Sequence, residues 1–346
     1  MTRRVEISTH SRLTGPTNSL ADIPGLRVGQ AHDTALASGV SVVLFDDPAT
    51  VGVSVLGGAA AGRDLAALAP DSTIQGVNAL VLSGGSGFGL DAASGVQAWL
   101  RARGIGFRLG AALIPIVPQA ICFDLLNGGD KAWGRYPPYR ELAHTACDNA
   151  GTEVALGSVG AGYGATTVDL KGGVGSASAT TPAGHGLAAL AVVNAVGSTV
   201  IGGGPHFWAG GYEIDGEFGG LGWPSQMPGE AGMLRWKGGP QPGTTIAIIA
   251  TDAVLDKPQA TRLAIAANDG LARALSLTHA PFDGDTIFAA ATGRKPLADP
   301  VQDLTALCAL AGTVLARAVA RGVYEAQALP FEGALPAWRD RFTPGG

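Results

Sequence analysis

Two kinds of apolar pattern alternate along the chain. Short runs rich in β-branched residues predict buried strands at residues 40–45, 51–55, 79–82, 246–251 and 286–289. Longer alanine-rich runs repeat their apolar residues every three to four positions, which predicts helices at residues 90–104, 141–151, 257–275 and 304–320. Asp303 is placed to cap the last of these helices, and a shorter helical pattern begins at residues 63–68.

The remaining segments predict core pieces, loops and one linker. Residues 187–193 and 199–201 are apolar enough to be core elements. The prolines of residues 114–118 argue against a central strand there, because proline cannot donate a ladder hydrogen bond. Residues 127–140 are predicted to be a loop, and residues 202–243 are the best linker candidate, with many turn signals and little apolar periodicity. The irregular order of strands and helices favours an α+β fold of packed layers over a doubly wound sheet.

Composition narrows the class of protein and of partner. The 346 residues are 46% hydrophobic and 15% charged, which is typical of a globular chain with a substantial core. The 53 glycines are about twice ordinary usage but follow no Gly-X-Y period, so they indicate turns and close backbone approach. A net charge of −5 without a lysine or arginine cluster argues against nucleic acid or an anionic membrane as a partner.

The cysteines, the histidines and the N-terminus add further exclusions. Cys122, Cys147 and Cys308 lack metal-ligand spacing and are predicted to be buried free thiols. The six histidines show no metal-binding or triad spacing, so neither a metal nor another cofactor is predicted. The basic N-terminus has no apolar stretch after it, and residues 187–201 are too interrupted to span a membrane. We therefore expect a cytoplasmic protein.

Two glycine-rich loops have to be weighed as phosphate sites. Residues 83–89 join a predicted strand to a predicted helix, where a loop can cradle phosphate, but no acidic residue follows at dinucleotide-site spacing. Residues 160–167 resemble the start of a P-loop, but no Gly-Lys-Ser/Thr sequence closes the loop. A nucleotide-binding protein using residues 83–89 stays open as an alternative.

The tripeptide Gly243-Thr244-Thr245 directly precedes the predicted strand at residues 246–251. Glycine punctuates turns and threonine favours strands, so a plain strand start explains it. If the chain is cut before Thr244, however, that residue carries a free α-amine beside its hydroxyl. Such an amine has a pKa of about 7.7–8.0 and can take the hydroxyl proton near neutral pH. Thr244 would then be both nucleophile and base.

Four other residues are candidates for the same chemistry. Asp283 and Asp285 share one side of an extended segment, where repulsion between them separates their pKa values. Lys171, flanked by glycines and apolar residues, could stabilise an oxyanion, although a lone lysine is usually solvated. Asn194 interrupts an apolar run, so its amide is either a structural hydrogen-bonding group or an oxyanion donor.

Several segments together resemble the L-aminopeptidase/D-esterase family of self-processing N-terminal-nucleophile hydrolases. That family includes β-peptidyl aminopeptidases and 6-aminohexanoate-oligomer (nylon-oligomer) hydrolases. The similar segments lie in the expected order over nearly the whole chain, at residues 20–29, 82–89, 114–118, 157–162, 244–253 and 283–286. The Asp283/Asp285 pair is closest to the 6-aminohexanoate-oligomer endohydrolase, since aminopeptidase relatives tend to carry a Ser/Glu variant there.

The resemblance implies a fold, a processing step and a set of roles. It implies one domain over residues 1–346 with an αββα sandwich, which cuts itself into an α fragment, 1–243, and a β fragment, 244–346. Thr244 would be the nucleophile, oriented by Asp283 and Asp285, with Lys171 and Asn194 stabilising charge. The substrate would be a small amide or peptide, and the assembly a homo-oligomer, a tetramer of α/β units.

One position departs from the family pattern. The residue before the cut is often asparagine in relatives, whereas here it is Gly243. Glycine removes side-chain crowding, and Gly-Thr is also the junction in proteasome-type nucleophiles, so self-cleavage is still predicted. The open alternatives are an aminopeptidase of the same family and a relative that keeps the fold without catalysis.

Overall fold

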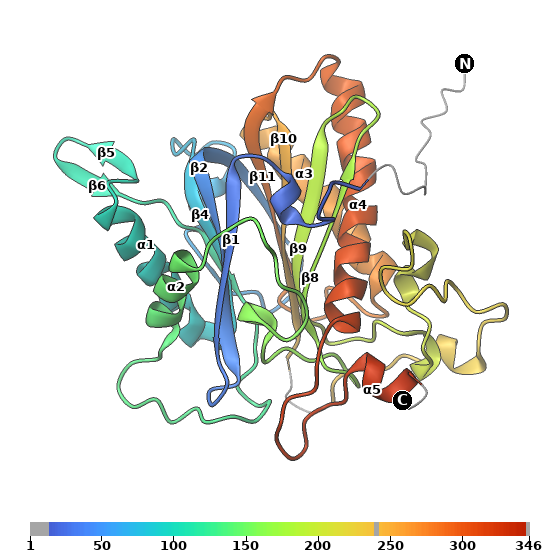
Figure 1. The fold of residues 1–346 in the computed structure, drawn as a ribbon. Helices are drawn as coiled ribbons and strands as arrows, with labels where there is room; N and C mark the ends of the chain where they lie inside the picture. The colour runs from blue at the N-terminus through green and yellow to red at the C-terminus, as the bar shows by residue number, and fades with distance from the viewer. Residues whose placement is uncertain (1–13, 239–241, 344–346) are drawn as a thin grey trace.

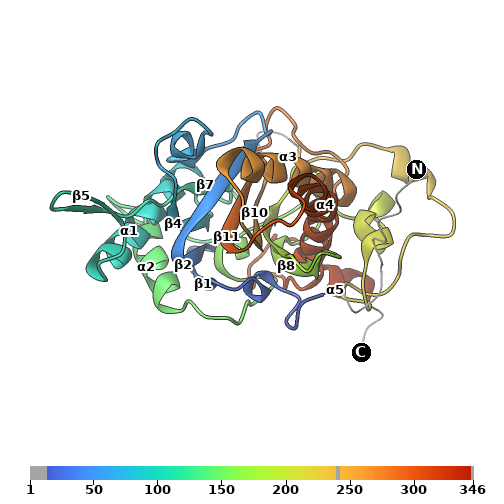
Figure 2. The ribbon, with the colours of Figure 1, turned by 90° about the horizontal axis from the view of Figure 1, so that it is seen from above.

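The chain folds into four layers, with two sheet layers packed face to face and helices on both outer sides (Figures 1 and 2). This computed structural model describes residues 14–238 and 242–343. The helices of the described part are α1 (Ala92–Ala102), α2 (Tyr139–Asp148), α3 (Lys257–Ala274), α4 (Pro300–Tyr324) and α5 (Trp338–Phe342). Helices α1 and α2 cover one sheet layer, and α3 and α4 cover the other, so the predicted α+β class and αββα sandwich are confirmed.

One strand connects the two sheet layers. The first half of β2 (Ser38–Val55) pairs with β1 (Leu26–Asp33) and β4 (Val77–Ser83), and its second half pairs with β11 (Thr286–Lys295). The ladder then continues through three further strands, β10 (Thr244–Ala253), β9 (Gly186–Asn194) and β8 (Gly173–Thr180). Short strands β3 (Gly62–Arg63) and β7 (Gln119–Ile121) extend the other edge, and β5 (Phe107–Leu109) pairs separately with β6 (Ala112–Ile114).

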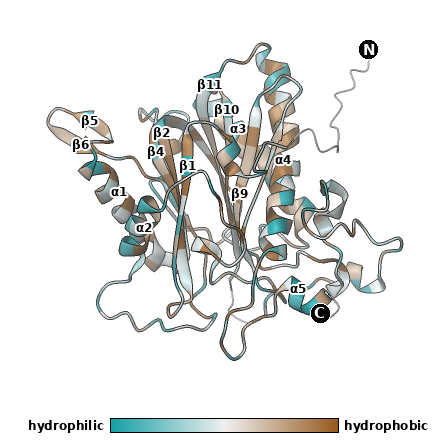
Figure 3. Cartoon of the chain, viewed as in Figure 1, coloured by the Kyte–Doolittle hydropathy of each residue, from teal (hydrophilic) through white to brown (hydrophobic). Residues whose placement is uncertain are grey.

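Side chains of the central strands alternate between two hydrophobic cores, one on each face of the sheet. In β10, Ile246 and Ile248 point into the layer between the sheets, where they meet side chains of β2 and β4. Ala247 and Ile249 point the other way, toward α3 and α4. Because successive strand residues face opposite sides, a strand buried on both faces has to be apolar at nearly every position. This explains the continuous apolar runs, which appear as the hydrophobic centre of the molecule in Figure 3.

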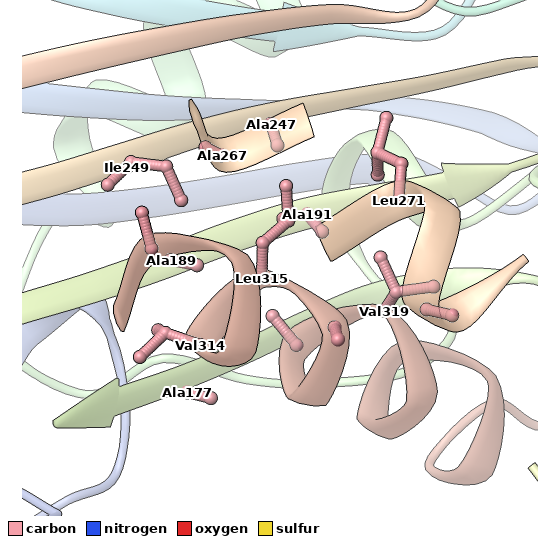
Figure 4. Packing of buried hydrophobic residues seen from close by; sticks show 14 of the residues in the cluster. Ala177, Ala189, Ala191, Ala247, Ile249, Ala267, Leu271, Val314, Leu315 and Val319 are labelled. Carbon is pink, nitrogen blue, oxygen red and sulfur yellow. The ribbon is translucent and has the colours of Figure 1, made fainter. Parts of the chain in front are cut away.

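The layer between the sheet and α3/α4 is packed with small and branched side chains. Figure 4 shows alanines of β8, β9 and β10 facing Leu271 of α3 and Val314, Leu315 and Val319 of α4. Small strand residues let the helices approach the sheet closely. Helix α4 is long and apolar enough to cross a membrane by length and composition alone, but more than half of its most apolar window is buried in this fold. A core helix accounts for that composition.

The structure changes three of the predicted elements. The strands expected at residues 40–45 and 51–55 form one strand, β2, with a register shift between Leu44 and Ala49. The cap of α4 is Asp299, whose carboxylate accepts from the N–H groups of Val301 and Gln302. Asp303 lies inside the first turn and accepts from the N–H groups before the helix.

The predicted linker packs against the core in its first half, around residues 207–218, whereas residues 219–236 are mostly exposed. It forms 3₁₀ turns at Ile201–Gly203, Trp208–Tyr212 and Gly229–Gly232. Phe207 and Phe218 join the core under α4, and Glu217 pairs with Arg317 of α4 at 2.5 Å. The first half of this segment is therefore part of the folded core and not a free linker, and the part at residues 239–241 lies outside the described residues.

Candidate active site

The predicted junction lies at the first residue of a buried central strand. Thr244 opens β10, is only 4% exposed, and stands directly opposite Asn194, the last residue of β9. Thr244 has the same strand parity as Ile246 and Ile248, which point between the sheets, and Asn194 the same parity as Leu190 and Val192. Strand pairing thus brings two residues that are far apart in sequence to one end of the inter-sheet layer.

The Thr244 hydroxyl is in contact with the bond that would be cut. Its Oγ1 donates a hydrogen bond to the carbonyl oxygen of Gly243. The same carbonyl accepts from the backbone N–H of Gly284 at 3.1 Å, and the N–H of Gly243 donates to Phe282 at 3.3 Å. A backbone donor already aimed at a carbonyl oxygen can stabilise the negative charge that develops there during attack.

Both glycines at the junction are required by close approach. A Cβ on Gly243 would lie 2.2 Å from the backbone nitrogen of Val196, and a Cβ on Gly284 would lie 2.6 Å from Oγ1 of Thr244. Real Cβ atoms do not come so close to other atoms, so any side chain here would displace the junction. Gly243, where relatives often have asparagine, is thus the residue type that the local packing allows.

The two predicted acids meet at the junction and take different roles. Asp285, 1% exposed, accepts from the N–H of Thr245 at 2.8 Å and from the N–H of His279 at 2.9 Å. Asp283 is equally buried, and its Oδ1 has no hydrogen-bond partner among the described residues. Burial, together with repulsion from Asp285 and a hydrogen bond with it, raises the pKa of Asp283 to about 8. Asp285 therefore holds the backbone, and Asp283 keeps one carboxyl oxygen, Oδ1, without a hydrogen-bond partner among the described residues.

The amide of Asn194 is held in one orientation. Its Oδ1 accepts from the N–H of Thr166 at 3.0 Å, and its Nδ2 donates to the carbonyl of Phe123 at 2.8 Å. Donors on one side and an acceptor on the other fix which end of the amide faces which way. The second hydrogen of Nδ2 has no partner among the described residues, so this N–H is available to donate to a substrate.

Lys171 is buried near the site but is engaged elsewhere. Its ammonium donates to three backbone carbonyls, those of Gly162 at 3.0 Å, Ala165 at 3.0 Å and Gly172 at 2.7 Å. All three of its hydrogens are therefore used, and it makes no hydrogen bond to Thr244 in the described residues. Burial lowers the pKa of Lys171 to about 7, opposed by the charge of Asp124. Here Lys171 ties the loop of residues 160–167 to the start of β8.

A second buried lysine lies closer to the predicted catalytic groups, and the sequence pattern did not single it out. Lys237, 8% exposed, donates to the backbone oxygen of Asn194 at 3.2 Å and to its Oδ1 at 3.3 Å. Burial lowers the pKa of Lys237 to about 8, and the nearby Cys122, Asp283 and Asp124 act in the opposite direction when they are ionised. Nothing in the local sequence marks it, since a lysine in a turn-rich segment is usually solvated.

Two cavities adjoin the junction and share Lys237 as a wall. One, of about 310 Å³, is lined by apolar side chains apart from Lys237, namely Val196, Leu234, Trp236, Leu277, Ala280, Pro281 and Phe282. The other, of about 30 Å³, is lined by Phe123, Asp124, Leu126, Asn127, Thr166, Lys237 and Pro242. Val196 and Phe282 also contact Gly243, so the larger cavity opens next to the predicted scissile carbonyl.

The glycine loop of residues 83–89 binds a buried side chain of the protein itself. The N–H of Gly85 donates to Asp124 at 2.7 Å, and Asp124 also accepts from Ser38 at 2.6 Å. A Cβ on Gly84 would collide with that carboxylate. A buried carboxylate thus occupies the place that a phosphate would need, and the loop carries no support for nucleotide binding. The three cysteines are free, as predicted, with Cys308 partly exposed.

The part of the chain that the structure describes contains no cluster of metal-ligating side chains. No group of three or more His, Cys, Asp or Glu side chains lies close enough there to hold an ion.

Comparisons with known proteins agree with this architecture. The sequence profile of peptidase family S58 matches residues 18–334. An uncharacterized aminopeptidase of Mycobacterium tuberculosis is 41% identical over 350 residues, which cover 95% of this chain and 98% of that one. A 6-aminohexanoate-oligomer endohydrolase of a Kocuria species is 31% identical over 132 residues, covering 36% of this chain and 34% of the other.

Two solved structures share the fold at low sequence identity. A Burkholderia β-aminopeptidase superposes with a TM-score of 0.70 at 22% identity, covering 97% of this chain and 94% of that one. The L-aminopeptidase D-Ala-esterase/amidase of Ochrobactrum anthropi, described as a variant of the Ntn hydrolase fold, also gives 0.70, at 20% identity, with 94% and 92% covered. With a profile match over most of its length and a relative that is similar from end to end, this chain belongs to peptidase family S58 and is a peptide or amide hydrolase.

Proposed function

We propose that the chain cuts itself between Gly243 and Thr244 and then hydrolyses amides with Thr244 as its N-terminal nucleophile. The observation that carries this proposal is the contact between the Thr244 hydroxyl and the Gly243 carbonyl, which also accepts from Gly284. Nucleophile, electrophile and oxyanion donor are adjacent before any substrate is present. Holding reacting groups in place in this way removes much of the entropic barrier.

The cut proceeds through an ester. Oγ1 of Thr244 attacks the carbonyl carbon of Gly243, and the carbon–nitrogen bond breaks as the hydroxyl proton passes to the departing Thr244 nitrogen. The N–H of Gly284 stabilises the oxyanion that forms on Gly243. Water then hydrolyses the ester, which leaves a carboxylate on Gly243 and a free amine on Thr244.

The cut creates an amine on Thr244, which gives Asp283 the hydrogen-bond donor that it lacks in the uncut chain. Asp283 is buried, with one carboxyl oxygen that has no partner among the described residues. A new ammonium group on the adjacent Thr244 would satisfy this oxygen and favour the charged form of the acid. In turnover the neutral amine takes the Oγ1 proton as the hydroxyl attacks a substrate amide, and the resulting acyl-enzyme is hydrolysed by water.

For the substrate, we propose amides of ω-amino acids such as 6-aminohexanoate oligomers. The 310 Å³ cavity beside the scissile carbonyl has apolar walls suited to a polymethylene chain. The Asp283/Asp285 pair and the partial similarity to the Kocuria endohydrolase support the same substrate. An aminopeptidase acting on α- or β-peptides is the second candidate, favoured by the end-to-end similarity to the mycobacterial aminopeptidase. Tetrameric assembly and a cytoplasmic location stay predictions from the sequence.

The proposal is tested by Thr244→Ala with Thr245→Ala as its matched control. The Thr245 hydroxyl is buried without a hydrogen-bond partner in the described residues, so its removal should leave the junction intact. We expect Thr244→Ala to run as one full-length band on a denaturing gel and to lack amidase activity, while Thr245→Ala splits and hydrolyses normally. A Thr244→Ala chain that still splits at this junction would refute the assignment.

The substrate is tested separately on the cleaved enzyme. Hydrolysis of 6-aminohexanoate oligomers and of L-aminoacyl p-nitroanilides is compared at equal enzyme concentration. We expect the oligomers to be cut faster. Hydrolysis of the L-aminoacyl compounds alone would replace our first candidate with the aminopeptidase.

A further inference from the structure

Lys237 is a buried cation that the mechanism above does not use. Its backbone N–H donates to Val196 at 2.9 Å, so the segment just before the junction is pinned beside the start of β10. No carboxylate of the described residues lies within salt-bridge distance of its ammonium, although Asp283 and Asp124 are close enough to act on it electrostatically. Burying a lysine without an ion partner is costly, and such groups concentrate at functional sites.

A comparison with two other buried lysines shows what sets Lys237 apart. Lys171 and Lys257 each donate to three backbone carbonyls, which uses all the hydrogens of the ammonium. Those two lysines tie loops together. Lys237 has only two acceptors in the described part of the chain, and both belong to Asn194, the residue opposite Thr244.

The contact with Asn194 determines how its amide is presented. Oδ1 accepts from Lys237 and from the N–H of Thr166, which turns the NH₂ end toward Phe123. Without the ammonium, Oδ1 would lose one of its two donors and the amide would be freer to rotate. The titratable groups that face Lys237 are the carboxyls of Asp283 and Asp124, the Cys122 thiol and the Lys171 amine.

We propose that Lys237 is a positioning residue for self-cleavage, supplied in cis by the segment that precedes the cut. Its ammonium holds the Asn194 amide opposite Thr244. This inference rests on the proposed cut at Gly243-Thr244, because it assigns a second residue to that same step. The chain would thereby require a correctly folded upstream segment before the junction can react.

The rate of chain splitting in the full-length protein tests this role. Lys237→Met keeps the apolar stem and removes the charge and the donors, and we expect splitting to slow by about tenfold to a hundredfold. Lys257→Met is the matched control, since it removes another buried lysine whose ammonium donates, within the described residues, to the carbonyls of Ala67, Ser72 and Ile74. The control should split at the wild-type rate once its folding is confirmed by circular dichroism.

A chemical rescue distinguishes positioning from packing. Lys237→Ala leaves a space that joins the 310 Å³ cavity, which small solutes can enter. We expect propylammonium to restore part of the splitting rate and n-propanol, of similar size, to restore none. If Lys237→Met fails to fold, Lys237→Gln replaces it, and slower splitting than in wild type is again expected.

Three results would overturn the inference: splitting of the folded Lys237 variants at the wild-type rate, no response to propylammonium, or equal rescue by n-propanol. These results are distinguishable from failure of the proposed function, which shows itself when Thr244→Ala still splits. If Thr244→Ala stays whole while the Lys237 variants behave as wild type, only the role of Lys237 is lost.

Discussion

Gly243→Ala should slow self-cleavage strongly, because the junction has no room for a methyl group. The added Cβ would lie 2.2 Å from the nitrogen of Val196 and 2.7 Å from the carbonyl carbon of Ala195, whereas ordinary contact begins at 3.4 Å. Both neighbours are backbone atoms of a packed segment, so Gly243 itself has to move by more than an ångström. That shift takes its carbonyl away from Oγ1 of Thr244 and from the N–H of Gly284, now at 3.1 Å.

A displacement of about 1 Å at a reacting centre can cost about a hundredfold in rate, and we expect a loss of that size here. The assay follows the disappearance of freshly purified full-length chain on a denaturing gel over time. Gly238→Ala is the matched control on the same upstream segment, because a Cβ at Gly238 meets no atom of the described residues within 4 Å. Equal splitting rates for Gly243→Ala and Gly238→Ala would refute the steric reasoning.

Two further predictions concern stability. In the uncut Thr244→Ala background, the raised pKa of Asp283 means that the folded chain binds this proton more tightly than the unfolded chain. Its contribution to stability is complete below the ordinary value of 3.8 and is lost as the pH rises toward about 8. Thermal unfolding should therefore show that Tm falls as the pH rises over that range. Adding Asp283→Asn should make Tm less dependent on pH. If the dependence of Tm on pH stayed the same, the raised pKa of Asp283 would be contradicted. Lys171→Met should lower the free energy of unfolding by about 3 kcal/mol or more, since three buried carbonyls lose their donor. Urea titration measures this change, and an unchanged midpoint of unfolding would contradict the prediction.

The layered fold could be predicted because its central strands obey a simple rule. Runs such as residues 246–251 are apolar at nearly every position, which only a strand covered on both faces requires. The continuity of β2 was not predictable in the same way. Asp46, Asp47 and Pro48 look like a turn, yet the strand passes through them with an irregular register and moves from one sheet layer to the other.

The catalytic candidates were predicted unevenly, for physical reasons. Asp283, Asp285 and Asn194 meet Thr244 because strand pairing and one tight turn fix their backbone positions. Lys171 was expected to stabilise charge in the site, and its three hydrogen bonds to backbone carbonyls are a property of the folded loop that the sequence pattern does not show. Lys237 carried no sequence signal at all, because its burial arises from distant segments that close over it.

The central claim is that Thr244 becomes a free N-terminus, and intact-mass measurement of the purified wild-type protein tests it most directly. The account predicts two chains whose masses correspond to residues 1–243 and 244–346, with Thr244 first in the second chain. A single intact chain of 34.7 kDa that nevertheless hydrolyses amides, or a cut at any other bond, would contradict it.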